Sequence, residues 1–357
     1  MKNLLLLISL LMWANEEKPM EKVIFFDVED YEREFLVGAC EGKYDYTLVS
    51  EPLNDLKKID SAFADARIIS CFTNSRVNAA VLEQFKNLGL IALRSVGFNH
   101  IDIAYCKEHD IAVETTPNYG NMSVAEFAMG LLLDVARKIT RSYLNLKERE
   151  VDPIASIGFE LHGKTIGIAG LGAIGAEMAR LAKGFDMKIL GYDIRENAEL
   201  EEKYGVKYTD FDTLLRESDI ISLHMPLTAE NNHIIDAAAF KKMKNTAVII
   251  NTARGELIET KALYTALTTG EIAGAGLDVL EFEETLSNPD YLDDIDRLTN
   301  KDLRKTLLNN RILTLNNVIV TPHIAYDTKE AINRILKTTM ENIGEFTQNR
   351  IQNNVAW

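Results

Sequence analysis

Residues 164–193 constrain the fold of this 357-residue chain more than any other segment. They open with a short apolar run, 165–169, which has the length and composition of a buried parallel strand. Three glycines spaced as G-x-G-x-x-G follow, then apolar residues recur at helical spacing, and a second apolar run, 187–192, ends on Asp193. A strand, a glycine turn, a helix, a strand and an acid within about 30 residues predict a parallel βαβ unit.

Each part of this unit suits a bound dinucleotide. Gly170 allows a tight turn, Gly172 lets the backbone approach a pyrophosphate, and Gly175 lets the helix pack closely on the strand. The helix that begins at Ala173 and Ile174 offers free N–H groups and a partial positive charge to phosphates. The alternative is that the glycines only pack a βαβ unit, but the complete pattern favours cofactor binding.

Asp193 indicates which dinucleotide is bound. It lies 18 residues after Gly175, where a carboxylate can accept hydrogen bonds from a ribose diol. A 2′-phosphate would meet a negative charge there, so the sequence favours NAD as the cofactor. Arg195, two residues further on, keeps NADP open as the alternative.

Charge and cysteine content restrict the partners. With 39 Lys and Arg against 54 Asp and Glu, the net charge is −15, which argues against nucleic acid and anionic membranes as partners. An anionic substrate would therefore need a local cationic pocket. Cys40, Cys71 and Cys106 are far apart and form no CxxC motif or Cys/His cluster. We therefore expect reduced thiols in a cytoplasmic protein and no metal site.

The first twenty residues form an apolar N-terminal extension. Residues 4–13 resemble the central region of a signal peptide but are too short to span a bilayer comfortably. Bulky Met12 stands where a small residue would precede cleavage after Ala14. We therefore expect Met20 to be the working start and expect no stable membrane insertion. Export of the protein, and an apolar arm that packs on a partner, are the alternatives.

Apolar runs alternate with helical stretches on both sides of the βαβ unit. The further predicted strands are 23–26, 46–49, 68–72, 90–93, 111–113, 220–223, 247–250, 274–277 and 318–320. The main predicted helices are 77–88, 123–141 and 328–346. Helix 123–141 is apolar over more than one stripe, which fits either a subunit contact or a core helix.

This alternation predicts an α/β protein with two open doubly wound parallel-sheet domains. A Rossmann-type NAD-binding domain, 119–326, is expected to be inserted into a smaller flavodoxin-like substrate domain. We assign 21–118 and 327–357 to that discontinuous domain, because the last helix is expected to return to it, and 1–20 to the extension.

Polar residues follow four successive predicted strands of the cofactor domain. Ligands bind beyond the carboxyl ends of such strands, so these residues are expected to face one site. The expected cofactor contacts beyond the glycine loop and Asp193 are Met225, Pro226, Asn231, Thr252, Ala253, Arg254 and Asp278. His224 is expected to orient the turn that follows it, and His100 to stabilise its own loop.

Several motifs resemble those of the D-isomer-specific 2-hydroxyacid dehydrogenases. They are RSVGFNHID, GLGAIG, NTARGELIE, GAGLDVLEFEE and VTPHIAY, and the similarity runs from about residue 23 to residue 346. The resemblance implies that the catalytic residues are Arg254, Glu283 and His323. It also implies substrate contacts from Val96, Gly97 and Tyr119, and a homodimer.

The interconversion of a 2-keto acid and a 2-hydroxy acid also explains the three charged residues without the resemblance. Arg254 can bind a substrate carboxylate bidentately and polarise the keto group. His323 can donate a proton to the carbonyl oxygen during reduction and take it back during oxidation. Glu283 can orient the imidazole and favour its charged form. Each residue alone has an ordinary explanation, as a surface ion pair, part of an acidic run or a loop residue; their combination favours catalysis.

The connection between Glu283 and His323 bears on the substrate. It is about 40 residues long and ends in His-Ile-Ala-Tyr, which looks more like D-lactate dehydrogenases than glycerate-type relatives. Reduction of pyruvate to D-lactate is therefore the predicted activity. Asn118 and Asn121 depart from the pattern of lactate enzymes, so a glyoxylate, hydroxypyruvate or 2-ketoisocaproate reductase is the alternative. A non-catalytic NAD-sensing regulatory protein is the alternative of a different class.

Overall fold

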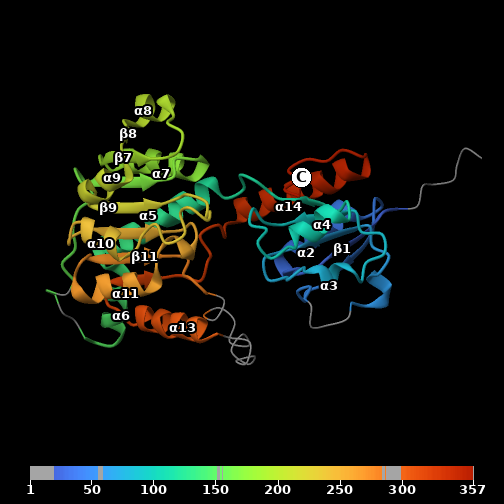
Figure 1. Cartoon of the computed structure of the whole chain (residues 1–357), viewed down its shortest axis with the longest axis horizontal. Coiled ribbons are helices and arrows are strands. Elements are labelled where there is room, and N and C mark those ends of the chain that lie inside the picture. The colour runs from blue at the N-terminus through green and yellow to red at the C-terminus, as the bar shows by residue number, and fades with distance from the viewer. Residues whose placement is uncertain are drawn as a thin grey trace, which may run out of the picture. The chain divides into compact units, whose positions relative to one another are not determined.

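The computed structural model describes residues 20–54, 59–150, 153–154, 156–283, 286 and 299–356. The predicted N-terminal extension and much of the connection that follows Glu283 lie outside the described residues. The chain divides into unit 1, Met1–Tyr119 with Lys329–Trp357, and unit 2, Gly120–Thr328 (Figure 1). Each unit is built around its own parallel sheet, which confirms the predicted α/β class.

Unit 1 contains a five-stranded sheet in the order β2-β1-β3-β4-β5, the flavodoxin-like order. Its strands are β1 (Lys22–Phe25), β2 (Asp45–Leu48), β3 (Ile68–Cys71), β4 (Leu90–Leu93) and β5 (Ala112–Glu114). Its helical segments are α2 (Asp30–Cys40), η2 (Ser61–Phe63), α3 (Ala79–Leu82), α4 (Ile103–Glu108) and α14 (Lys329–Thr347). Because α14 packs against β4 and α2, the last helix of the chain belongs to the first unit.

Unit 2 contains a seven-stranded sheet in the order β12-β11-β10-β9-β6-β7-β8. Its strands are β6 (Thr165–Ala169), β7 (Lys188–Tyr192), β8 (Lys207–Tyr208), β9 (Ile220–Leu223), β10 (Val248–Asn251), β11 (Gly274–Leu277) and β12 (Val318–Val320). The order reverses between β6 and β9, which is the switch point at which a Rossmann-type sheet binds its dinucleotide.

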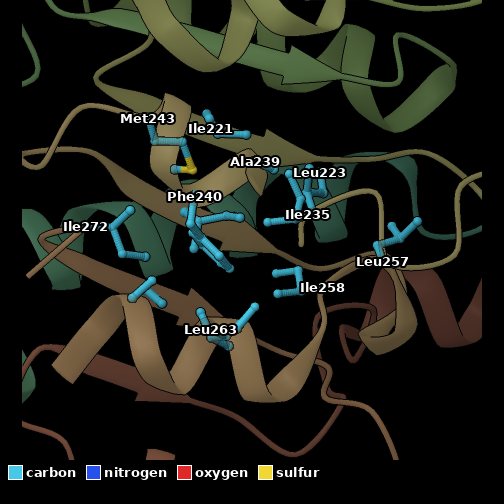
Figure 2. Close-up of a cluster of buried hydrophobic side chains, with 14 of the residues drawn as sticks. Ile221, Leu223, Ile235, Ala239, Phe240, Met243, Leu257, Ile258, Leu263 and Ile272 are labelled. Carbon is cyan, nitrogen blue, oxygen red and sulfur yellow. The ribbon is translucent and has the colours of Figure 1, made fainter. Parts of the chain in front are cut away.

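Helices cover both faces of this sheet. They are α5 (Asn121–Arg137), α6 (Ile139–Lys147), α7 (Ala173–Gly184), α8 (Ala198–Tyr204), α9 (Phe211–Glu217), α10 (Ala237–Lys242), α11 (Thr260–Thr269) and α13 (Asn300–Leu313), with the turn η3 (Gly255–Leu257). Figure 2 shows Phe240 of α10 and Leu263 of α11 packed with Ile221 and Leu223 of β9. A second cluster joins α5 and α7 to the other face, where Leu132 and Met178 are fully buried.

Burial explains why the strands were predictable. The central strands β3, β4, β9, β10 and β11 have every residue buried. Parallel strands covered on both faces are nearly continuous apolar runs, and such runs are visible in a sequence. Every strand predicted from such a run agrees with the structure to within one residue, whereas the two-residue edge strand β8 was not predicted.

The predicted helix over residues 77–88 is wrong, because α3 ends at Leu82. The Asn78 side chain caps α3 by accepting a hydrogen bond from the N–H of Val81. Further along, the N–H of Lys86 donates to the carbonyl of Ala64 (2.7 Å). That long-range bond replaces the helical pattern, so tertiary contacts outweigh the local helix propensity.

The predicted helix over residues 123–141 is two helices. Lys138 adopts φ +54°, which ends α5 at Arg137. Asp134 stabilises the break by accepting hydrogen bonds from the backbone N–H (2.8 Å) and the hydroxyl (2.5 Å) of Thr140. Since α5 packs on α7, β10 and β11 within unit 2, its broad apolar surface is a core face.

Two further observations concern the environment of the chain. No helix among the described residues is long and apolar enough to cross a bilayer. Cys40, Cys71 and Cys106 are all buried free thiols.

Candidate active site

The glycine loop after β6 has a separate structural reason for each of its three glycines. Gly170 adopts φ +92°, and a Cβ there would lie 2.6 Å from the backbone that joins His224 to Met225. A Cβ on Gly175 would lie 2.0 Å from the carbonyl oxygen of Gly170. A Cβ on Gly172 would meet open space, so the backbone is exposed at the start of α7. The amino end of α7 has no side-chain cap, and its N–H groups can donate hydrogen bonds to an anion.

Asp193 closes the loop from the end of β7. One carboxylate oxygen accepts a hydrogen bond from the N–H of Leu171 (2.6 Å), and the other accepts one from the N–H of Arg195 (3.0 Å). The acid is therefore fixed against the glycine loop, while each oxygen retains a lone pair for a ribose hydroxyl. Of the loop residues, Ala173 and Ile174 form the first turn of α7.

The loop after β9 lies against the glycine loop. The N–H of His224 donates to the carbonyl of Ala169 (2.7 Å), and its Nε2 contacts the Ser222 hydroxyl (2.8 Å). Burial lowers the pKa of His224 to about 4, so the imidazole is neutral. Asn231 shapes the rest of this loop, because its amide donates to the carbonyl of Pro226 and accepts from the N–H of Thr228 (both 2.7 Å).

The turn after β10 carries Arg254. The Asn251 side chain closes this turn by accepting from the N–H of Ala253 (3.0 Å) and donating to the carbonyl of Arg254 (2.9 Å). Sequence analysis did not assign Asn251 to the site, although an Asn at the end of a strand is a known turn-forming signal. Within the described residues, the buried hydroxyl of Thr252 has no hydrogen-bond partner.

Asp278, at the end of β11, holds the loop that carries His323. Its carboxylate accepts hydrogen bonds from the hydroxyl of Thr321 (2.5 Å) and from the N–H groups of Ile324 (3.0 Å) and Ala325 (2.8 Å). Burial raises the pKa of Asp278, although these hydrogen bonds act to lower it. The structure therefore places this predicted cofactor contact beneath the His323 loop, and Thr321 is a partner that sequence analysis missed.

Glu283 and His323 form a hydrogen-bonded pair. His323 Nδ1 lies 2.5 Å from one Glu283 carboxylate oxygen, and the other oxygen accepts from the N–H of Leu280 (2.8 Å). Desolvation acts to lower the pKa of His323, but the hydrogen bond and charge of Glu283, with the charge of Asp278, outweigh it and raise that pKa. The ring therefore keeps its second proton to higher pH than an ordinary histidine.

Arg254 belongs to the same cluster of charges. Its guanidinium acts on His323 electrostatically in the direction that opposes protonation of the ring. One of its N–H groups donates to the carbonyl of Ala253 (2.7 Å), which leaves further donors for a ligand. Unit 2 thus brings together Arg254, Glu283 and His323, which are 69 residues apart from first to last in the sequence.

The remaining predicted substrate contacts lie in unit 1. Val96 follows β4, and its side chain is exposed. The hydroxyl of Ser95 donates to the carbonyl of Gly97 (2.7 Å), which shapes this loop. The carbonyl of Tyr119 accepts a hydrogen bond from Arg334 of α14 (2.7 Å). His100 is part-buried in the same region, and burial lowers its pKa to about 4, so it is a neutral loop residue.

The residues of unit 2 fit NAD. The open backbone at Gly172 and the uncapped end of α7 suit a pyrophosphate, and Asp193 suits a ribose. Two buried polar atoms near the ends of β9 and β10, His224 Nδ1 and Thr252 Oγ1, have no partner among the described residues and are free to meet a ligand. No group of three or more His, Cys, Asp or Glu in this part of the chain is arranged to hold a metal ion.

Known proteins are similar to this chain in sequence and in fold. Residues 129–325 match the family model of the D-isomer specific 2-hydroxyacid dehydrogenase, NAD binding domain. The D-lactate dehydrogenase of Escherichia coli is 35% identical over 324 residues, which cover 90% of this chain and 95% of the relative. The hydroxypyruvate reductase of Thermotoga maritima is 42% identical over 261 residues, covering 73% and 78%.

A solved structure agrees over nearly the whole chain. The crystal structure of the Aquifex aeolicus D-lactate dehydrogenase, complexed with NAD and lactic acid, has a TM-score of 0.81 and 34% identity, and the match covers 92% of this chain and 96% of that one. Sequence, fold and the cofactor-binding loop therefore agree. The chain belongs to the D-isomer-specific 2-hydroxyacid dehydrogenase family and is an NAD-dependent 2-hydroxyacid oxidoreductase.

Proposed function

We propose that this protein is a D-lactate dehydrogenase that interconverts pyruvate and D-lactate. The observation that carries the proposal is the hydrogen-bonded Glu283–His323 pair beside the Arg254 charge at the carboxyl edge of the sheet. Such an arrangement supplies a cation for a carboxylate and a proton for a keto oxygen. The similarity to proteins named D-lactate dehydrogenase from E. coli and A. aeolicus supports the choice of substrate.

In this proposal each side chain has one role. Arg254 binds the carboxylate of pyruvate bidentately and polarises the adjacent keto group. His323 donates the proton on Nε2 to the keto oxygen, while its Nδ1 stays bonded to Glu283. Glu283 stabilises the imidazolium before transfer and fixes the ring orientation. NADH held by the glycine loop and Asp193 would supply the hydride for C2 of the keto acid, so that the products would be D-lactate and NAD.

We assign the cofactor and the remaining substrate contacts as the family resemblance implies. The glycine loop, Asp193 and the loops after β9, β10 and β11 would hold NAD. The backbone N–H groups of Val96 and Gly97 would bind the substrate carboxylate, and Tyr119 would contact the substrate. Asp193 favours NAD, since a 2′-phosphate would meet its negative charge.

We also propose a cytoplasmic homodimer. The surface of α6 supports the dimer, because the side chains of Ile139, Tyr143 and Leu146 are more than half exposed. Exposed apolar patches of this kind commonly mark protein interfaces. Three buried free thiols and the use of NAD favour the cytoplasm.

A second candidate is a hydroxypyruvate or glyoxylate reductase. The 42% identity to the T. maritima hydroxypyruvate reductase favours it. A 2-ketoisocaproate reductase would use the same three catalytic residues. A non-catalytic NAD sensor would need none of them, and the Glu283–His323 pair speaks against that function.

Steady-state NADH oxidation with a panel of 2-keto acids tests these proposals. The panel comprises pyruvate, glyoxylate, hydroxypyruvate, phosphohydroxypyruvate and 2-ketoisocaproate. We expect the highest kcat/KM with pyruvate. A higher value with hydroxypyruvate or glyoxylate would assign the second candidate, and tight NADH binding without turnover of any member would assign the sensor.

A further inference from the structure

The turn that carries Arg254 lies directly against the turn that carries Glu283. A Cβ on Gly255 would lie 2.1 Å from the carbonyl carbon of Leu280 and 2.4 Å from the nitrogen of Glu281. Gly255 is itself buried. The absence of a side chain at Gly255 lets these two backbone segments meet. The position of one segment relative to the other therefore depends on the interactions that join them.

Glu281 is the centre of the groups around this contact. The side chain is 2% exposed, yet it is a carboxylate. One oxygen accepts from the N–H (2.9 Å) and the hydroxyl (2.6 Å) of Thr260, and the other accepts from His233 and Lys305 (both 2.8 Å). Burial acts to raise the pKa of Glu281, but these partners lower it to about 2, so the carboxylate is ionised.

His233 joins the two turns from a third loop. Its backbone N–H donates to the carbonyl of Glu256 (2.8 Å), which follows Arg254 and Gly255. Its ring Nε2 bonds Glu281, two residues before Glu283. Because an ionised carboxylate can only accept, Nε2 must carry the proton of this bond. His233 is therefore hydrogen-bonded to residues of both segments that meet at Gly255.

Helix α13 completes the cluster from the far side of the long connection. Lys305 pairs with the Glu281 carboxylate, and the amide of Asn309 donates to the Glu281 carbonyl (2.8 Å). Lys305 therefore holds the side chain of Glu281, and Asn309 holds its backbone. The partners of Glu281 come from α11, α13 and the loop after β9, so the catalytic turn is fixed from three directions.

We propose that the cluster of His233, Glu281 and Lys305 is a positioning device that fixes Arg254 relative to the Glu283–His323 pair. The proposal rests on the proposed function, because it assigns no catalytic step to the cluster itself. The cluster is linked to the reacting groups through the backbone of the two turns. Buried ionic networks of this kind fix one geometry, and catalytic constellations lose activity when they shift by about 1 Å.

The test compares kcat, the KM for pyruvate, the Kd for NADH and the pH dependence of kcat in five variants. Glu281→Gln and His233→Leu break the cluster. His233→Gln keeps a side-chain N–H that can replace the Nε2 donor of the histidine. Lys305→Met removes the cation, and Lys301→Met is its control, because Lys301 is exposed on the same helix. We expect kcat to fall about 10-fold or more in the three disruptive variants, since small misplacements of catalytic groups can cost about 10²-fold.

The expected pattern distinguishes positioning from general stability. NADH affinity should stay within about 2-fold of wild type, because the glycine loop is untouched. His233→Gln should recover most of the kcat lost in His233→Leu. The alkaline limb of the kcat profile should move to lower pH in Glu281→Gln as Glu283 loosens its hold on His323. The charged groups that act on His323 are Glu283, Asp278 and Arg254, so such a shift would report a displaced Glu283.

Two reference variants separate failure of this inference from failure of the proposed function. If Arg254→Ala and His323→Gln lose activity while all cluster variants keep wild-type kcat and pH profile, the positioning role is wrong and the proposed mechanism stands. A parallel loss of kcat and NADH affinity in the cluster variants would also overturn it, because that pattern indicates a general structural role. If Arg254→Ala and His323→Gln remain active, the proposed mechanism itself is wrong.

Discussion

His323 illustrates how a single side chain acquires a catalytic property from its neighbours. Its ring faces Glu283 on one nitrogen, and Asp278 and Arg254 act on it electrostatically with opposite signs. The two carboxylates outweigh both desolvation and the guanidinium, so the pKa of His323 lies above the ordinary value for histidine. An imidazole that keeps its second proton to higher pH than an ordinary histidine is a suitable proton donor for reduction of a keto group.

This shift predicts the pH dependence of pyruvate reduction. Reduction needs protonated His323, so the rate should fall as pH rises through the raised pKa, which lies above the ordinary value of about 6.5. Glu283→Gln removes the charge that raises that pKa, and the falling limb should therefore move to lower pH. A series of kcat/KM values against pH for both proteins checks this. Superimposable profiles would show that Glu283 does not act on the proton donor.

At the scale of elements, burial decides what the sequence can reveal. Strands covered on both faces appear as apolar runs, and all the strands predicted in this way are present. Helix 77–88 could not be predicted correctly, because the bond from Lys86 to Ala64 that ends the helical pattern is a tertiary one. Lys138, whose left-handed backbone separates α5 from α6, is neither glycine nor proline, so the sequence gives no signal of this break.

The candidate site, too, was only partly predictable from the sequence. Arg254, Glu283 and His323 were predicted from motifs, and unit 2 places them in one cluster. Their supports were not predicted, because hydrogen bonds from His233 and Lys305 to Glu281 join segments far apart in the chain. In the sequence Glu281 is only a member of an acidic run, and nothing there distinguishes it from a solvated surface residue.

The glycine loop offers a matched pair of variants at this scale. Gly175→Ala places a methyl group 2.0 Å from the carbonyl of Gly170, so we expect a loss of unfolding free energy of about 1–3 kcal/mol, typical of overpacking. Gly172→Ala places its methyl in open space, so the folded state should be nearly unaffected while NADH binding weakens.

Urea unfolding and NADH titration of both glycine variants measure these effects. The two substitutions add the same methyl group, which makes each the control for the other. Equal stability of the two variants would contradict the packing role of Gly175. Wild-type NADH affinity in Gly172→Ala would contradict the proposed approach of the pyrophosphate.

At the scale of the whole molecule, the two sheets differ in strand order and are built from different parts of the chain. Unit 1 includes both ends of the described chain, because α14 packs on β4 and α2. Unit 2 is continuous and carries the cofactor loop together with the three charged residues. The sequence left open whether the apolar surface of α5 is a subunit contact or a core face; the structure packs it within unit 2, and exposed apolar side chains occur on α6.

The proposed homodimer is testable through α6. A Tyr143→Glu, Leu146→Glu double variant should shift the protein from dimer to monomer, because charges cannot be buried in an apolar interface without a partner. Leu307→Glu is the control, since Leu307 is 67% exposed and belongs to α13 rather than to α6. Light scattering coupled to size-exclusion chromatography gives the mass. A wild-type monomer, or a double variant that remains dimeric, would exclude α6 as the subunit contact.

The most direct test of the central claim follows the hydride and the stereochemistry together. Purified protein is incubated with pyruvate and NADH that carries deuterium at both C4 positions, and the lactate is analysed by mass spectrometry and chiral chromatography. We predict D-lactate with one deuterium at C2 and a stoichiometric amount of NAD. L-lactate, unlabelled lactate, or no lactate from a protein that binds NADH would contradict the proposed function.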